Sequence, residues 1–298
     1  MSTNYEWDDL PDVVRMKVQD HIGEVASATA NTDGQTSDVA ATLDLASGEK
    51  VFLKGVCGIS RRMRFLRNEA TAGDIALGLS PEVLFHEDIT VGNDDWFVVG
   101  FEHVTGRAAN LAPSSIDFPL IAATVSRIAE LPANGFRSLR DRWSGGESWQ
   151  TLADESPDTV AAMSTPVDQL IKWEQMAPEL VHGDRLVHTD LHKDQFIIDG
   201  DSKVHVIDWG FPGAGQPWID SAFLTIRLIG TGHNPERAES WAREATPLSV
   251  AGDDALTAFT VYISGLWSYW AATDSEPGAT ERAQMARDYA AYRLSLKL

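Results

Sequence analysis

The stretch that decides the fold is LVHTDLHKDQFIID, from Leu186 to Asp199, and it is followed by VIDWG at Val206–Gly210. Two short apolar runs flank the turn DGDS and predict a β-hairpin. The polar residues HTD come directly after the apolar pair LV, and Asp208 ends the second run. Because an unpaired buried carboxylate is costly in a core, chemistry explains these residues better than packing does.

Roughly the first hundred residues predict a small antiparallel sheet with helices. Apolar residues recur every four positions from Leu10 to Ile22, which predicts an opening amphipathic helix. A hairpin follows around the turn SGEK at 47–50, and a helix is predicted over 61–79. Two further strands, over 82–89 and 94–104, are joined at TVGND.

The chain becomes mainly helical after Gly106. Helices are predicted over 120–131, over 166–180 and from 218 to the end, whereas 137–149 has the composition of a loop-rich link. In the last segment, apolar side chains at i, i+3, i+4 and i+7 predict a buried helix face, with a tryptophan that stacks on a substrate ring as the alternative: Ile263, Leu266, Trp267 and Trp270. The order of elements predicts an α+β fold.

Composition excludes several classes of protein. The 298 residues are 43% hydrophobic and 23% charged, which is ordinary for a globular protein, and one cysteine, Cys57, excludes an internal disulfide. The N-terminus lacks the features of a secretory signal and no run is long enough to span a membrane, so a cytoplasmic protein is expected. Lys+Arg number 24 against 44 Asp+Glu, a net charge of −20, which disfavours nucleic acid and anionic membranes as partners. Such a surface attracts a polycationic small molecule, although solubility or a salt-adapted host explains it equally well.

The motifs together resemble those of the aminoglycoside phosphotransferase family of small-molecule kinases. That family has H-G-D-L-H-x-x-N before an apolar strand and then I-D-[WF], and this chain has HTDLHKDQFII and VIDW. The segment GAGQPWIDSA is similar to the family's G-x-P-x-x-D-L-A. The specific match covers about 187–222, and the rest agrees only in the order of elements. The resemblance implies a bilobal, protein-kinase-like fold, with a small β-rich nucleotide-binding lobe over 1–104 that ends in the hinge and a larger helical lobe over 105–298.

The resemblance assigns Asp190 as the catalytic base and Asp208 as a ligand of Mg²⁺, to which hard oxygen donors are suited. The second metal ligand is Gln195, where the family usually has asparagine, so its carbonyl must retract by one bond length. Thr189 replaces the usual glycine. A literal HGD ends at Asp184, but no apolar strand follows it at the right distance, which favours Asp190.

For the nucleotide, ATP or GTP, the resemblance implies a strand lysine, Lys54, on the phosphates and a helix glutamate, Glu69, paired with it. The backbone of Glu102 and Val104 is expected at the base edge. The loop DGQTSD at 33–38 is expected to cover the phosphates through two hydroxyl donors, Thr36 and Ser37.

Each assignment has a structural alternative. Lys54 can also be interpreted as an exposed lysine on a strand, and Glu69 as a solvated residue on a helix. Asp190 and Asp208 can also be interpreted as turn or cap residues. The resemblance gives Asp220 and His188 the role of bracing the catalytic loop. The acid pairs Asp253–Asp254 and Asp274/Glu276 fit either acceptor amines or plain acidic loops.

These inferences lead to an ATP- and Mg²⁺-dependent phosphotransferase that acts on a hydroxyl of a small molecule. An aminoglycoside or another antibiotic, whether cationic or not, is the favoured acceptor, in resistance or self-protection. Two alternatives stay open: a kinase of a nucleoside, sugar or biosynthetic intermediate, and a nucleotide-binding pseudokinase. The oligomeric state is not predicted.

Overall fold

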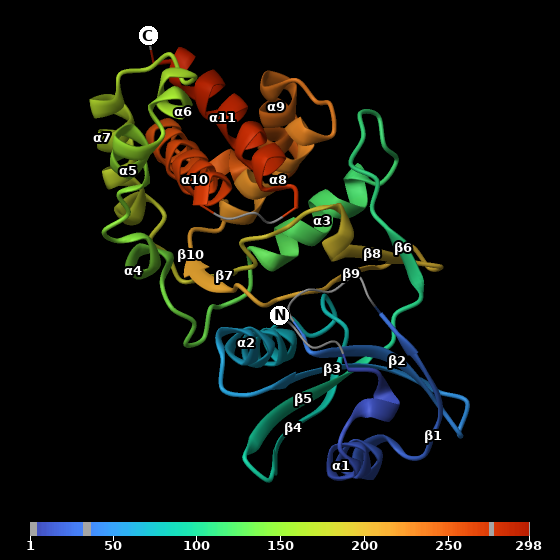
Figure 1. Ribbon diagram of the computed structural model, residues 1–298. Helices are drawn as coiled ribbons and strands as arrows, with labels where there is room; N and C mark the ends of the chain where they lie inside the picture. Colours follow the sequence, from blue (N-terminus) through green and yellow to red (C-terminus); the bar gives the residue numbers. More distant parts are fainter. Residues whose placement is uncertain (1–4, 32–36, 274–276, 298) are drawn as a thin grey trace. The chain divides into compact units, whose positions relative to one another are not determined.

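The computed structural model describes residues 5–31, 37–273 and 277–297 (Figure 1). The chain divides into two compact units, residues 1–108 with 194–212, and residues 109–193 with 213–298. The antiparallel sheet of the N-terminal part and the helical C-terminal part confirm the α+β fold class. The boundary expected at residue 104 stays a prediction about where the nucleotide-binding lobe ends.

The first unit is built on a five-stranded antiparallel sheet, in the order β1-β2-β3-β5-β4, and a three-stranded sheet, β6-β8-β9. Its elements are the 3₁₀ turn Trp7–Asp9, α1 (Asp12–Ile22), β1 (Val25–Ala30), β2 (Val39–Leu45), β3 (Lys50–Cys57), α2 (Arg61–Ile75), β4 (Val83–Val91), β5 (Asp94–Glu102), β6 (Gly106–Ala108), β8 (Phe196–Asp199) and β9 (Val204–Val206). The predicted hairpins are thereby confirmed. Strand β1 escaped prediction because its sequence VASATA is largely exposed and alternates only small residues, alanine with serine or threonine.

Alternation along the central strands gives the larger sheet two apolar faces. Trp96 and Val98 of β5 pack in one cluster with Val14 and Val18 of α1. The intervening residues of β5, with Leu66 of α2, form a second cluster on the other face. The sheet therefore lies between α1 and α2, and side chains of β3 on the α2 face point toward that helix.

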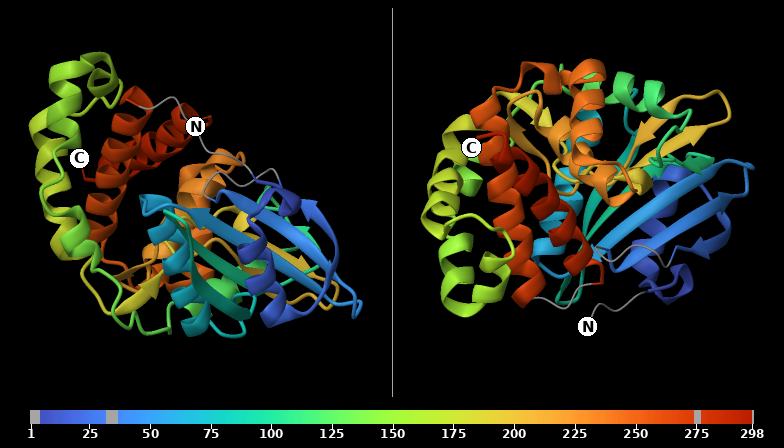
Figure 2. Two further views of the ribbon diagram at one scale, coloured as in Figure 1. Left: turned by 60° about the horizontal axis from the view of Figure 1, so that its bottom comes forward. Right: turned by 90° about the horizontal axis from the view of Figure 1, so that it is seen from above.

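The second unit is mainly helical. Its elements are α3 (Phe118–Ile128), α4 (Leu139–Trp143), α5 (Ser148–Glu155), α6 (Pro157–Ala161), α7 (Val167–Leu180), β7 (Arg185–Val187), β10 (Gly213–Gly215), α8 (Ile219–Gly230), α9 (Pro235–Ala245), the 3₁₀ turn Pro247–Val250, α10 (Asp253–Thr273) and α11 (Ala279–Ser295). The 3₁₀ turn Lys193–Gln195 begins at the last residue of this stretch of the second unit and runs into β8. Strands β7 and β10 pair antiparallel. The long helices α10 and α11 run side by side (Figures 1 and 2).

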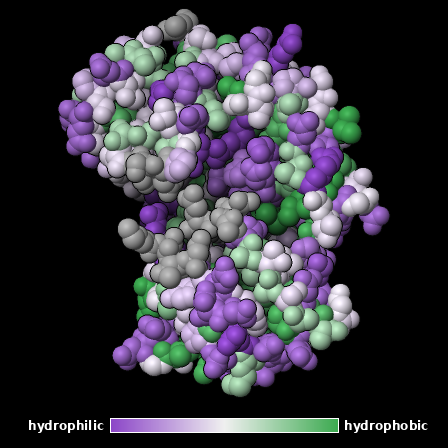
Figure 3. Space-filling model, turned by 45° about the vertical axis from the view of Figure 1, so that its right-hand side comes forward, coloured by the Kyte–Doolittle hydropathy of each residue, from purple (hydrophilic) through white to green (hydrophobic). Residues whose placement is uncertain are grey.

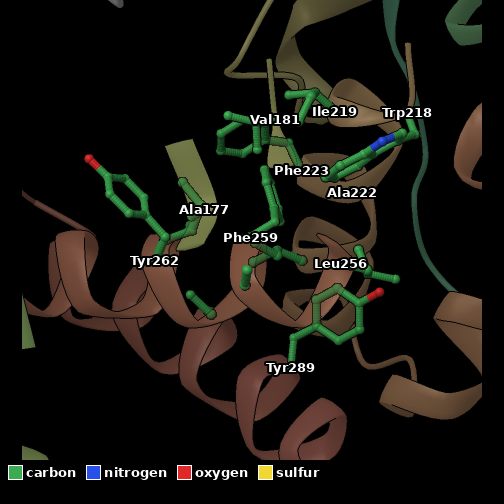
Figure 4. Packing of buried hydrophobic residues seen from close by; sticks show 14 of the residues in the cluster. Ala177, Val181, Trp218, Ile219, Ala222, Phe223, Leu256, Phe259, Tyr262 and Tyr289 are labelled. Atoms are coloured by element: carbon green, nitrogen blue, oxygen red, sulfur yellow. The ribbon is translucent and has the colours of Figure 1, made fainter. Parts of the chain in front are cut away.

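Aromatic rings hold α8 against α10. Phe259 of α10 meets Trp218 and Phe223 in edge-on contacts, with ring centroids 5.6 and 5.0 Å apart (Figure 4). Of the predicted buried stripe, Ile263 and Trp267 are buried but Trp270 is 42% exposed. The stripe therefore lies in the core at its N-terminal end and reaches the surface at Trp270.

The predicted loop over 137–149 was wrong, because α4 and the start of α5 form there. These helices are too short to show a helical period. Burial stabilises them instead: Trp143 and Trp149 lie in the core, and Trp149 Nε1 donates to the carbonyl of Val261 at 2.9 Å. Ser138 caps α4 by accepting from the amide of Arg140.

The surface is largely hydrophilic on the face that Figure 3 shows, with hydrophobic residues scattered among the hydrophilic ones. In the described part of the chain, no helix has the length and hydropathy needed to cross a membrane.

Candidate active site

Lys54 is the centre of a charged cluster in the first unit. Residues 52, 54 and 56 of β3 share the face that packs on α2, so the lysine points at the buried side of that helix. Its Nζ donates to Glu69 Oε1 at 2.8 Å and also to Asp208 Oδ1. Three residues predicted for the site are therefore brought together, the outer two 154 positions apart in the chain.

The electrostatics of this cluster keep the lysine charged. Burial disfavours the ammonium, but Glu69 and Asp208 outweigh it and raise the pKa of Lys54. Burial raises the pKa of Glu69, against the opposing effect of Lys54. One ammonium thus compensates two carboxylates, of which only Glu69 is nearly inaccessible to water.

A cavity of about 190 Å³ in the first unit begins at this cluster. It is lined by Asn31, Thr42, Phe52, Lys54, Glu69, Ser80, Pro81, Phe101, Glu102, His103, Val104, Ile197 and Ile207. Apolar side chains from β3 and β5 and from the hairpin β8–β9 make up its walls, which suits a flat heterocycle. The cavity includes both residues predicted at the base edge, Glu102 and Val104. The amide of Glu102 already donates to the carbonyl of Glu82 at 2.8 Å, so base contacts from Glu102 would come from its carbonyl.

The loop predicted to cover the phosphates is described only at its end. Thr36 lies outside the described residues. Ser37 is buried and precedes Asp38, whose carboxylate accepts from the Cys57 amide at 2.9 Å and from Arg62 Nη1 at 2.6 Å. The role of Thr36 and Ser37 in phosphate binding stays a prediction.

The two predicted metal ligands lie at either end of the β8–β9 hairpin. The amide of Ile207, next to Asp208, donates to the carbonyl of Gln195 at 3.0 Å, so the backbone at the two ends is in contact. Gln195 is buried, whereas the Asp208 side chain is 43% exposed and has a positive φ of 61°. Both supply oxygen donors, which fit Mg²⁺. Among the residues described, His, Cys, Asp and Glu form no cluster of three able to hold a metal unaided, so the remaining ligands would be waters or substrate phosphates.

In the second unit, buried Asp220 of α8 braces the loop that follows β7, as the resemblance implied. Its carboxylate accepts from the backbone amides of His188 at 2.8 Å and Thr189 at 2.9 Å. His188 Nδ1 in turn accepts from the amide of Asp190 at 3.3 Å. Burial raises the pKa of Asp220, and His188 and the two amides oppose that rise.

Thr189 adopts the left-handed conformation, with φ at 67°. This explains why glycine is usual at that position in the resembling family. A β-branched residue is strained there, at a cost of roughly 1–2 kcal/mol. The loop keeps the required backbone shape despite the substitution.

Asp190 forms an ion pair that sequence reasoning missed. Arg227 Nη2 of α8 donates to Asp190 Oδ1 at 2.7 Å, and the guanidinium lies 4.9 Å from the Trp267 ring centroid. Burial lowers the pKa of Arg227, against the effect of Asp190. The available signal was spacing, because Arg227 lies seven positions after Asp220 and so shares its helix face. Asp184, the alternative, is 92% exposed beside Arg185.

The acid pairs considered for acceptor amines have structural partners. Asp253 accepts from Arg243 at 3.0 Å and from Arg293 at 3.1 Å, and Asp254 pairs with Lys297 at 2.6 Å. Residues 274 and 276 lie outside the described part of the chain. The described pair is therefore engaged in holding helices together.

Comparison with known proteins agrees with this geometry. No curated protein sequence matches the chain. A thermostable mutant of an aminoglycoside phosphotransferase, in ternary complex with AMP-PNP and hygromycin B, has 19% identity and a TM-score of 0.62, over 96% of this chain and 98% of that one. Choline kinase LicA from Streptococcus pneumoniae has 15% identity and a TM-score of 0.61, over 94% and 98%. Amicoumacin kinase hAmiN, in complex with AMP-PNP, Ca²⁺ and Ami, has 14% identity and a TM-score of 0.55, over 93% of each.

These likenesses establish the fold, which is that of the kinase-like phosphotransferases. The model of the phosphotransferase enzyme family (APH) matches residues 76–259, more than half of the chain. That range includes β5, the loop with Asp190, the β8–β9 hairpin with Asp208, and α8. The chain therefore belongs to the phosphotransferase enzyme family, as a small-molecule phosphotransferase with a hydroxyl group as acceptor.

Proposed function

We propose that the protein transfers the γ-phosphate of ATP, with Mg²⁺, to a hydroxyl of an aminoglycoside or another antibiotic, in resistance or self-protection. The observation that carries the proposal is the shared ammonium of Lys54, held between Glu69 and Asp208 at the edge of a cavity of about 190 Å³ with apolar walls. Phosphoryl transfer depends mainly on positioning and on charge stabilisation, and this cluster is suited to both.

The nucleotide is assigned to the cavity of the first unit. The base would lie between the apolar walls, with the carbonyl of Glu102 and the amide of Val104 at its edge. Lys54 would contact the phosphates, and Glu69 would keep the lysine extended and charged. Ser37 and Thr36 remain candidates for phosphate contacts.

Gln195 and Asp208 would hold Mg²⁺ through their side-chain oxygens. The ion would offset negative charge on the phosphates during transfer. Asp208 then serves two partners, because Lys54 contacts one of its oxygens. The longer side chain of Gln195 is already buried, which favours a fixed position for its amide.

Asp190 is assigned as the base. As the acceptor oxygen forms its bond to the γ-phosphorus, the bond from that phosphorus to the bridging oxygen breaks and ADP leaves with the electron pair. The hydroxyl proton passes to Asp190. No covalent enzyme intermediate is needed, so transfer is direct.

A second acceptor class is favoured by one observation. Asp190 is already neutralised by Arg227, and Asp253 and Asp254 are paired with cations. These carboxylates therefore attract a polycation less than the net charge of −20 suggests. A nucleoside, a sugar or another uncharged biosynthetic intermediate is the alternative acceptor.

The test is a panel of acceptors assayed by ADP release, with MgATP and MgGTP, followed by mass analysis of the product. Hygromycin B, choline, uncharged sugars and nucleosides represent the classes. We expect one acceptor to gain a mass of one phosphate, and Asp190→Asn to lower its kcat by about 10²–10⁴-fold. Nucleotide-dependent thermal stabilisation without transfer to any member of the panel would contradict the proposal and favour a pseudokinase.

A further inference from the structure

Arg227 is placed unusually for a residue that serves stability alone. Its side chain is 12% exposed, its Nε has no hydrogen-bond partner within the described structure, and its guanidinium lies over the Trp267 ring. The ion pair is weak evidence for stability, because desolvation of the guanidinium offsets its attraction to Asp190, whose side chain is 35% exposed.

The second observation is that one helix fixes three consecutive residues of the loop. Asp220 of α8 binds the amides of His188 and Thr189, and Arg227, two turns later on the same face, binds the side chain of Asp190. Backbone and carboxylate are thus held by the same rigid element. Such support from a helix is what a precisely placed catalytic group needs.

We infer that Arg227 is a positioning residue of the transfer reaction, which fixes the Asp190 carboxylate through Oδ1 and leaves Oδ2 to receive the acceptor hydroxyl. This inference rests on the proposed function, since it takes Asp190 as the base. The Asp190 side chain is 35% exposed, so the carboxylate stays accessible to an acceptor. With Oδ1 held, rotation of the carboxylate is restricted and the hydroxyl meets a defined oxygen.

The charge of Arg227 has a second effect on the same step. An ionised carboxylate repels the anionic phosphoryl group to which its bound hydroxyl must be delivered. A guanidinium 2.7 Å from the carboxylate offsets that repulsion without occupying the acceptor's position.

The test compares Arg227→Met and Arg227→Lys with the control Arg237→Met, which removes an equal charge from an exposed position on α9. The probes are hydrolysis of MgATP, with water as acceptor, and transfer to the most active member of the panel. We expect Arg227→Met to lower kcat by about 100-fold while KM for MgATP changes less than about twofold, since only orientation is lost. Arg227→Lys should restore about a tenth of wild-type kcat, because its ammonium is a point charge without the planar fork.

A double-mutant cycle separates positioning from a structural role. In an Asp190→Asn background, Arg227→Met should have no further effect on kcat, because Arg227 acts through that carboxylate. Equal losses in both backgrounds would overturn the inference, as would an unchanged or increased kcat in Arg227→Met. If that variant does not fold, Arg227→Lys decides: a loss of about tenfold in kcat at unchanged melting temperature supports positioning, and wild-type kcat refutes it.

The outcomes distinguish the inference from the function on which it rests. Loss of activity in Asp190→Asn with full activity in Arg227→Met refutes only the positioning role. Full activity in Asp190→Asn refutes the base assignment itself.

Discussion

Replacing Lys54 with methionine should make the stability of the first unit depend on pH. The Lys54 side chain is 10% exposed and that of Glu69 is 11% exposed, so removing the ammonium strands a carboxylate away from water. Breaking a buried pair by removing one partner costs about 3–5 kcal/mol. Asp208 adds little, because at 43% exposure its charge is largely solvated.

The pH dependence follows from Glu69. Burial already raises its pKa above the ordinary 4.5, and removing Lys54 removes an effect that lowers it. A carboxyl with a raised folded-state pKa binds protons more readily when folded, so its favourable contribution is complete below 4.5 and is lost as pH rises through the folded value. Lys54→Met should therefore be nearly as stable as wild type at acidic pH and fall behind toward neutral pH.

Urea denaturation across this pH range measures the effect, and hydrogen exchange of peptides from β3 and α2 locates it. The double variant Lys54→Met/Glu69→Gln is the matched control. Its neutral amide should recover more than half of the lost free energy at neutral pH and abolish the pH dependence. A loss below about 1 kcal/mol in Lys54→Met, or the same loss at every pH, would refute the reasoning about a stranded carboxylate.

Three further changes test other parts of the molecule. Thr189→Gly should stabilise the protein by about 0.5–1 kcal/mol in urea denaturation, because relief of the left-handed strain exceeds the entropy cost of glycine; a destabilised variant would contradict this. Gln195→Asn should tighten the apparent Mg²⁺ affinity severalfold in titrations of activity, since the shorter side chain need not retract; unchanged affinity would argue against ligation. Glu239→Gln should cost about 1–3 kcal/mol, because it removes the buried charge to which Arg293 Nη1 donates at 2.8 Å and leaves Arg293 with Asp253 alone as a charged partner, whereas exposed Glu244→Gln on the same helix should cost under about 0.5 kcal/mol.

Local patterns in the sequence were sufficient to predict most of the fold. The alternating burial of β2, the continuous apolar run of β5 and the helical periods of α1 and α2 are each visible within one short segment, because they reflect burial of that segment against its neighbours. The short helix α4 has no such period and depends on distant tryptophan packing, so it was mistaken for a loop. Strand β1 was not predicted because it is largely exposed, so its pairing with β2 does not require large apolar residues in its sequence.

The residues of the candidate site likewise differ in whether the sequence could predict them. Asp208 was predicted from a short motif, whereas Lys54 and Glu69 were predicted from the order of elements, and the mutual contact of the three follows from the fold. Arg227 belongs to no motif; only the path of α8 brings it to Asp190, 37 positions away.

Thr189 shows why a departure from a motif need not signal lost function. Glycine is usual there because the backbone is left-handed, and the threonine keeps that shape at a cost in strain. The strain is sustained by the two amides bound to Asp220 and by the Asp190 carboxylate bound to Arg227. A helix that holds the loop at three successive residues can absorb an unfavourable residue within it, so the geometry of the base is better judged from α8 than from the motif alone.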